Sequence, residues 1–199
     1  MSSIHTTQLT LAQQVLGKNS SLVTKVLLAI AGSMILAVSA KIHIPFYPVP
    51  MTMQTFVVLV IGMAYGWRLG GATILLYLAE GAVGLPVFSG TPERGLGLAY
   101  MAGPTGGYLM GFIISAITVG WLAERGWDRN VLKTLAAMTI GTSVIFCSGL
   151  IWLGTVIGWD KPVLALGLTP FIYGAILKIA LAAAALPFAW KATNHTKKQ

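Results

Sequence analysis

Apolar segments close to the length of a transmembrane helix recur along almost the whole chain. Such a helix needs about 20 predominantly apolar residues. The segments lie at 23–40, 52–67, 69–88, 104–123, 131–156 and 168–190. Only 9% of the 199 residues are charged, whereas soluble domains average about 25%. The solvent for most of this chain is therefore lipid, and the sequence predicts an all-α integral membrane protein with six transmembrane helices.

The lysines and arginines are distributed unequally between the two ends of these segments. With both termini placed in the cytoplasm, nine fall inside: Lys18, Lys25, Arg68, Arg125, Arg129, Lys133, Lys191, Lys197 and Lys198. Three fall outside: Lys41, Arg94 and Lys161. Cytoplasmic loops carry an excess of basic residues, so both termini are predicted to be cytoplasmic, in a multi-pass protein of the cell (inner) membrane. The same rule explains the net charge of +8 without a nucleic-acid partner.

The chain is predicted to form one domain, since no linker or repeat divides it. Residues 1–22 are expected to be a cytoplasmic N-terminal tail, because they lack the charged start and short apolar stretch of a signal peptide. Residues 23–190 form the membrane domain, and 191–199 are a cytoplasmic C-terminal tail. The second and third segments meet at Trp67-Arg68, which predicts a tight helical hairpin.

Two loops on the outer side are longer than simple connections require. Residues 41–55 contain Pro45, Pro48 and Pro50, which prevent a regular helix and suggest a stiff apolar flap over the outer face. Residues 89–109 are rich in glycine. Both loops either join helices or form a lid or pocket, since loops of this length are often functional.

Charged residues stand inside two of the predicted spans. Lys178 lies in 168–190 and Glu80 lies in 69–88, which runs in the opposite direction. Each is about nine residues, or about 13 Å, from the outer end of its span. One interpretation is a structural ion pair. The other is a ligand site, because ionisable groups inside a membrane are costly and often functional.

Small residues form a stripe on the first span. Ala29, Ser33 and Ala37 are spaced by four and therefore share one helical face. Such a stripe allows a second helix to approach closely. The second helix either belongs to this chain or to an external membrane subunit.

The sequence offers little support for an enzyme. Residues 147–150, CSGL, contain a serine inside a span, but no histidine in any span is available as its base. No GxxxxGK[ST] motif is present for ATP hydrolysis. No carboxylate–histidine cluster suggests a metal site, and no cofactor is expected.

Four motifs in the chain resemble a known family. They are PVPMTMQTF (48–56), YLAEGAVGLPVFSG (77–90), AGPTGGYLMGF (102–112) and TPFIYGAILKIALAA (169–183). Together they resemble the biotin-binding S components of energy-coupling-factor transporters, the BioY family. The resemblance implies six membrane helices with both termini in the cytoplasm. It also implies capture of biotin, delivered with a transmembrane coupling subunit and a pair of ATPases.

The resemblance also suggests roles for individual residues. Lys178 matches the family lysine that is expected to meet the biotin carboxylate. Ala175 stands where the family has an aspartate expected to contact a ureido N–H, so Glu80 is the candidate substitute. Ala29, Ser33 and Ala37 become the predicted face for docking to the coupling subunit.

The remaining candidate site residues come from the two loops and neighbouring spans. Gln54, either a helix-capping residue or a ligand contact, and Thr105 are the candidate polar contacts. The predicted aromatic lining is Phe46, Tyr47, Tyr77, Phe88 and Tyr108. Biotin capture is the predicted function. The alternatives are an S component for another small anionic vitamin or precursor, and a membrane scaffold with a structural Lys178–Glu80 pair.

Overall fold

Helices dominate the computed structural model, which describes residues 8–196. Five of the described segments are helical, long and apolar enough to cross a membrane. They are α2 (Leu22–Lys41), α3 (Gln54–Ala82), α5 (Gly106–Ala123), α6 (Val131–Ile157) and the span Val163–Thr193, which includes α7 (Val163–Gly167), the 3-10 turn η1 (Thr169–Phe171) and most of α8 (Ile172–Thr196). The all-helical membrane fold is therefore confirmed. The predicted tail lysines Lys197 and Lys198, together with residues 1–7 and 199, lie outside the described residues.

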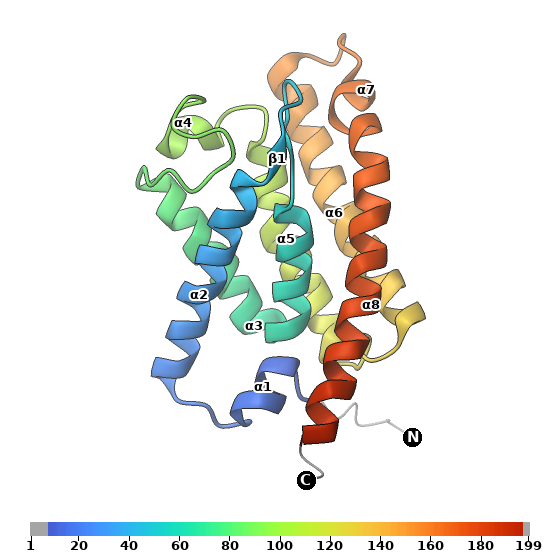
Figure 1. Cartoon of the computed structure of the whole chain (residues 1–199). Coiled ribbons are helices and arrows are strands. Elements are labelled where there is room, and N and C mark those ends of the chain that lie inside the picture. The colour runs from blue at the N-terminus through green and yellow to red at the C-terminus, as the bar shows by residue number, and fades with distance from the viewer. Residues whose placement is uncertain (1–7, 197–199) are drawn as a thin grey trace, which may run out of the picture.

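The second and third predicted spans form a single element, α3, that is broken at Gly66. This glycine has φ +80° and ψ 174°, a conformation that side chains with a Cβ rarely adopt. The chain turns back at this point, so that the two parts of α3 form a hairpin (Figure 1). A Cβ built at Gly70 would lie 3.0 Å from the Cα of Gly62, so the two parts are in close contact.

The third predicted span ends earlier than expected. Residues 83–88 were expected to be helical, but α3 ends at Ala82. Gly84 then adopts φ +97° and Pro86 follows it, so neither residue suits a continuing helix. The correction matters because it places Phe88 in a loop.

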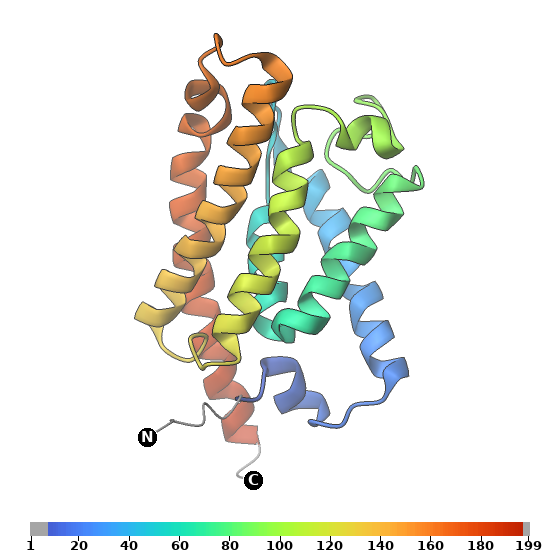
Figure 2. The same cartoon turned by 180° about the vertical axis from the view of Figure 1, so that it is seen from behind.

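The proline-rich segment forms a short hairpin at the end of the bundle opposite α1 (Leu11–Leu16) (Figure 1). Strand β1 (His43–Ile44) pairs antiparallel with β2 (Met51–Thr52). Pro48, Val49 and Pro50 are buried. The prediction of a non-helical flap is confirmed. The short helices α4 (Gly97–Met101) and α7 lie at the same end (Figure 2).

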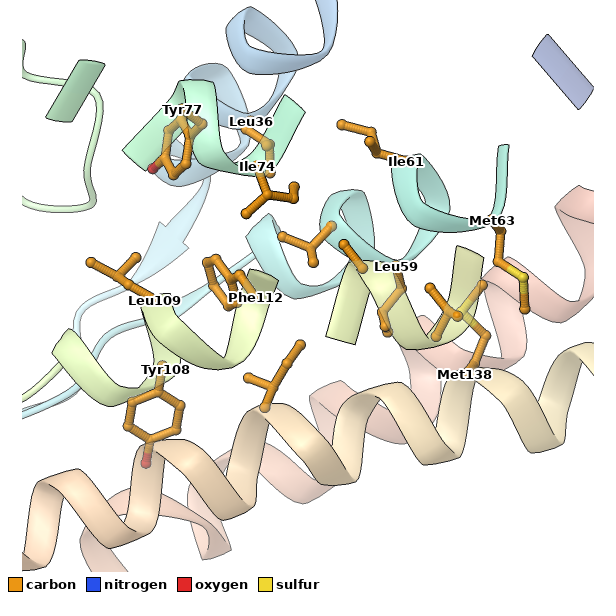
Figure 3. Close-up of a cluster of buried hydrophobic side chains, with 14 of the residues drawn as sticks. Leu36, Leu59, Ile61, Met63, Ile74, Tyr77, Tyr108, Leu109, Phe112 and Met138 are labelled. Atoms are coloured by element: carbon orange, nitrogen blue, oxygen red, sulfur yellow. The ribbon is translucent and has the colours of Figure 1, made fainter. Parts of the chain in front are cut away.

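Helix α5 lies at the centre of the bundle and contacts α3 and α6 most extensively. In its most apolar 18-residue stretch 67% of the residues are buried, against 22% for α2 and 28% for α6. Figure 3 shows Leu59, Phe112 and Met138 in the cluster of buried side chains that these helices form. The outer helices expose apolar side chains, as lipid contact requires.

Residues 8–16 pack beneath the bundle at the end opposite the hairpin. Helix α1 (Leu11–Leu16) begins with a capping box between Thr10 and Gln13, and Thr10 is buried. The backbone N–H of Gln8 donates to the carbonyl of Glu124 (2.8 Å). This part of the predicted tail is therefore docked on the membrane domain.

Candidate functional site

A cavity lies at the hairpin end of the bundle, where β2, α3, α5, α6 and α8 converge. Its volume open to the centres of water-sized molecules is about 70 Å³, several times what one water needs. Its polar lining is Thr52, Gln54, Thr55, Ser89, Thr105, Thr142 and Lys178. Its aromatic lining is Phe56, Phe88, Tyr100, Tyr108, Phe112, Phe146 and Phe171. A ring-containing ligand with a few polar groups suits such a surface.

Lys178 extends from α8 across the cavity to the start of α3. Its Nζ donates to the carbonyl oxygen of Thr52 (2.6 Å) and to Oγ1 of Thr55 (3.1 Å). These bonds reduce the cost of holding an ammonium group among apolar helices. An ammonium has three N–H donors, so a third remains for a ligand. The group is half-buried and lines the cavity, so the arrangement can bind an anion.

Glu80 does not join Lys178, contrary to expectation. It accepts a hydrogen bond from the Ser33 hydroxyl at the contact of α2 with α3, and it does not line the cavity. Within residues 8–196 the two charged groups form no ion pair. Because α3 ends at Ala82, Glu80 lies near the end of its helix and not at the expected depth, and the rotation of each helix also decides which way a side chain faces.

The small-residue stripe of α2 meets α3 at Ser33. Ser33 is 1% exposed and Ala29 and Ala37 are half-buried. Close by, a Cβ at Gly32 would lie 2.6 Å from the methyl group of Thr73 in α3. Ser33 therefore meets α3 inside the chain, whereas the docking of a coupling subunit on Ala29, Ser33 and Ala37 stays a prediction.

Gln54 is held rigidly at the first turn of α3. Its Nε2 donates to the Tyr77 hydroxyl (2.7 Å), and its Oε1 accepts from the Thr52 hydroxyl (3.1 Å). The Tyr77 hydroxyl in turn donates to the carbonyl of Val87 (3.0 Å). Gln54 thus lines the cavity as a fixed polar group, whereas Tyr77 is fully buried behind it and does not line the cavity.

The other predicted residues divide between the cavity and its surroundings. Phe88, Tyr108 and Thr105 line it. Tyr108 is fixed by its hydroxyl, which donates to the carbonyl of Gly167 (2.8 Å). Phe46 lies outside and packs edge-on against Phe171, with the centroids 6.1 Å apart. Tyr47 is 85% exposed and also lies outside.

Several lining residues were not predicted from the sequence. Thr52 and Thr55 flank Gln54 within the PVPMTMQTF motif, and a threonine beside a candidate polar contact was the available signal. Tyr100, Phe112, Phe146 and Phe171 lie among many other apolar residues, where periodicity does not single them out. Ser89 is the most informative of this group. It is 2% exposed, and its hydroxyl has no hydrogen-bond partner among the described residues.

Three proteins illustrate what this chain is similar to. A probable biotin transporter BioY of Pyrococcus horikoshii is 37% identical over 146 residues, which cover 73% of this chain and 83% of the relative. The biotin transporter BioY2 of Lactococcus lactis is 33% identical over 186 residues, covering 91% and 97%. A biotin transporter BioY of Rhizobium etli is 38% identical over 167 residues, covering 79% and 88%.

The fold also matches a solved structure. It is the crystal structure of the S-component for biotin from an ECF-type ABC transporter. The TM-score is 0.69 over 89% of this chain and 92% of that chain, at 22% sequence identity. At this identity the match shows the shared fold. The model of the BioY family matches residues 7–195, and this chain therefore belongs to the BioY family.

Proposed function

We propose that this protein captures biotin as the substrate-binding S component of an energy-coupling-factor transporter. The observation that carries the proposal is the half-buried ammonium of Lys178, which stands in an otherwise aromatic and hydroxyl-lined cavity. A carboxylate can accept its third N–H, while fused rings fill the apolar part of the cavity. The relatives named as biotin transporters support this choice of ligand.

The ureido group of biotin needs both donors and acceptors. Ala175 lines the cavity, so the position of the family aspartate faces the ligand without an acidic group. Gln54, Ser89 and Thr105 are the polar groups proposed to contact the ureido group instead. Ser89 is favoured because its buried hydroxyl has no other partner in the described structure. An unpaired buried polar group costs about 1–3 kcal/mol, which a ligand bond would recover.

The proposed topology has six membrane crossings and both termini in the cytoplasm. It treats the two parts of α3 on either side of Gly66 as separate crossings. The excess of lysine and arginine at the end where α1 lies supports it. The cavity then lies at the outer end of the protein, where it meets extracellular ligand.

The proposed partners are a transmembrane coupling subunit and a pair of ATPases, and the proposed role is transport and not catalysis. The protein is embedded in the lipid bilayer. Co-purification of the complex and ATP-dependent uptake of biotin into proteoliposomes are expected. Uptake by this protein alone, without the partners, would contradict the partner assignment.

Equilibrium binding of radiolabelled biotin to the purified protein in detergent tests the ligand. We expect saturable binding that excess unlabelled biotin abolishes. Biotinamide, which lacks the carboxylate, is expected to compete poorly. Absence of saturable binding would overturn the proposal. Because Ala175 replaces the aspartate, another small anionic vitamin is the second candidate, and stronger competition by lipoate or pantothenate than by biotin would favour it.

A further inference from the structure

Residues 87–91 contribute Phe88 and Ser89 to one wall of the cavity, and the segment is held in place from three helices. We call this segment the Phe88 wall. The Tyr77 hydroxyl donates to the carbonyl of Val87 (3.0 Å), and the Tyr100 hydroxyl donates to that of Ser89 (2.8 Å). Lys41, the last residue of α2, donates to the carbonyls of Phe88 and Thr91, each at 3.1 Å. The backbone of the wall is thus fixed by α3, α4 and α2.

The ring of Phe88 is enclosed by two tyrosines. Tyr100 stacks on it, with the centroids 4.9 Å apart and an angle of 21° between the planes. Tyr77 meets it edge-on at 5.5 Å and 83°. Both tyrosines are also bonded to the backbone of the wall, so neither can shift alone. The ring is 1% exposed and lines the cavity.

Gly81 of α3 meets the tip of this ring. A Cβ built there would lie within 2.6 Å of three Phe88 atoms, Cζ, Cε1 and Cε2. Gly81 is buried within the helix and does not have positive φ. Glycine destabilises a helix by about 1 kcal/mol relative to alanine. The backbone therefore does not require glycine at this position, whereas the Phe88 ring does.

We propose that Gly81 determines the ligand size that the cavity accepts, without touching the ligand, by leaving room for the Phe88 ring to stand back from the cavity. The proposal rests on the proposed function. A methyl group at residue 81 displaces the ring. Helix α3, Tyr77 and Tyr100 occupy its other sides, so the cavity is the side that remains. The space for the ligand rings then decreases.

Three variants test this: Gly81→Ala, Phe88→Leu and the double variant. Leucine lacks counterparts of the three ring atoms that clash, so it leaves room for the methyl group. We expect Gly81→Ala to lower biotin affinity at least about tenfold in the wild-type background. In the Phe88→Leu background the same substitution should change affinity by less than about threefold, because coupled positions are non-additive. Equal effects in the two backgrounds would overturn the proposal.

Gly71→Ala is the matched control, because Gly71 is also a buried glycine of α3. Its Cβ would meet Cγ1 of Ile117 at 3.0 Å, and neither residue lines the cavity. Biotin affinity is expected to stay within about twofold of the wild type. A loss as large as that of Gly81→Ala would show a general effect of helix packing and would contradict the proposal.

Two readouts separate this inference from the ligand assignment. If the wild-type protein binds no biotin, the proposed function fails. The midpoints of thermal unfolding of the ligand-free variants still test the contact between residues 81 and 88 in that case. Additive midpoint changes would then overturn the inference. If Gly81→Ala does not fold, the comparison is between Phe88→Leu and the double variant. Their affinities should agree within about threefold, and a larger loss in the double variant would count against the proposal.

Discussion

Lys178 and Asp128 are both charged side chains withdrawn from water, and their surroundings differ. Lys178, at the hairpin end, has two hydrogen-bond acceptors and faces a cavity. Asp128, at the opposite end beside α1 and the last turns of α8, is 0% exposed and does not line that cavity. One of its oxygen atoms accepts from Nε1 of Trp190 (2.5 Å), and the other has no partner in the described structure. The first arrangement can bind a ligand, whereas the second joins parts of the chain.

Asp128 connects the loop between α5 and α6 to the end of α8. The neighbouring Arg129 lies over the Trp190 ring at 4.2 Å and donates to the carbonyl of Leu9 (3.1 Å). The N-terminal segment, the loop and α8 therefore meet at one cluster. Burial raises the pKa of Asp128 from 3.8 to about 6, although the bond from Trp190 and the charge of Arg129 act in the opposite direction. The difference between the two ends shows that a buried charge in this protein indicates a ligand site only where the charged group also lines a cavity.

Lys178→Ala is expected to have the largest effect, and that effect should fall on binding. The ligand carboxylate would be desolvated without a partner, at a cost of about 2–5 kcal/mol. Biotin affinity should fall at least about tenfold, measured by equilibrium binding. Biotinamide should lose its disadvantage in this variant. Lys161→Ala is the control, because Lys161 is exposed and pairs with the exposed Asp160. If Lys178→Ala bound biotin with unchanged affinity, Lys178 would not be a ligand contact and would not differ from Asp128 in this respect.

Asp128→Asn is expected to change stability and leave binding intact. A folded-state pKa of about 6, above the ordinary 3.8, means that the folded protein binds this proton more tightly than the unfolded chain. This tighter proton binding stabilises the folded state fully below about pH 4, and the stabilisation is lost as the pH rises through 6. Since one pKa unit corresponds to about 1.4 kcal/mol, the free energy of unfolding of the wild type should fall by up to about 3 kcal/mol over this pH range.

The thermal midpoint in detergent between pH 4 and 7.5 measures this change. The wild type should become less stable across the range, and Asp128→Asn should show a much smaller decline and greater stability at pH 7. Its biotin affinity should equal that of the wild type. The same pH dependence in both proteins would show that another group titrates.

Glu80 sharpens the comparison, because it is an intramembrane acid that does not line the cavity. Glu80→Leu leaves the buried Ser33 hydroxyl without its acceptor, which should reduce stability by about 1–3 kcal/mol. Adding Ser33→Ala should recover part of the loss, since both partners are then apolar. Biotin affinity should not change. A clear loss of affinity in the stably folded Glu80→Leu protein would mean that Glu80 acts on the ligand after all.

Thr55→Val is expected to have the smallest effect. It removes one of the two bonds of Lys178 and keeps the shape of the side chain. The cost to binding should be about 0.5–1.5 kcal/mol, or about twofold to thirteenfold in affinity. Thr118→Val is a suitable control, because Thr118 donates to a carbonyl of its own helix α5 and does not line the cavity. An effect of Thr55→Val as large as that of Lys178→Ala would show that Thr55 has a further role.

Much of the candidate site follows from the local sequence. Lys178, Gln54 and Thr105 were predicted as ligand contacts and line the cavity, although only binding measurements can test their role. The prolines of 41–55 indicated a non-helical segment because their rings exclude the helix interior. In contrast, Tyr77 and Phe46 do not line the cavity. A residue that belongs to a motif near the site is expected to lie close to it, but the motif does not predict the direction of its side chain.

The sequence by itself determined the apolar, membrane-helix character of the chain and the approximate positions of its helices. These follow from composition and from the fixed rise of a helix. Only the tertiary structure decided how each helix is rotated and which neighbour it meets. Glu80 therefore bonds to Ser33 and not to Lys178, and Ser33 on α2 faces α3. The physical reason is that rotation about a helix axis is set by packing between side chains distant in sequence.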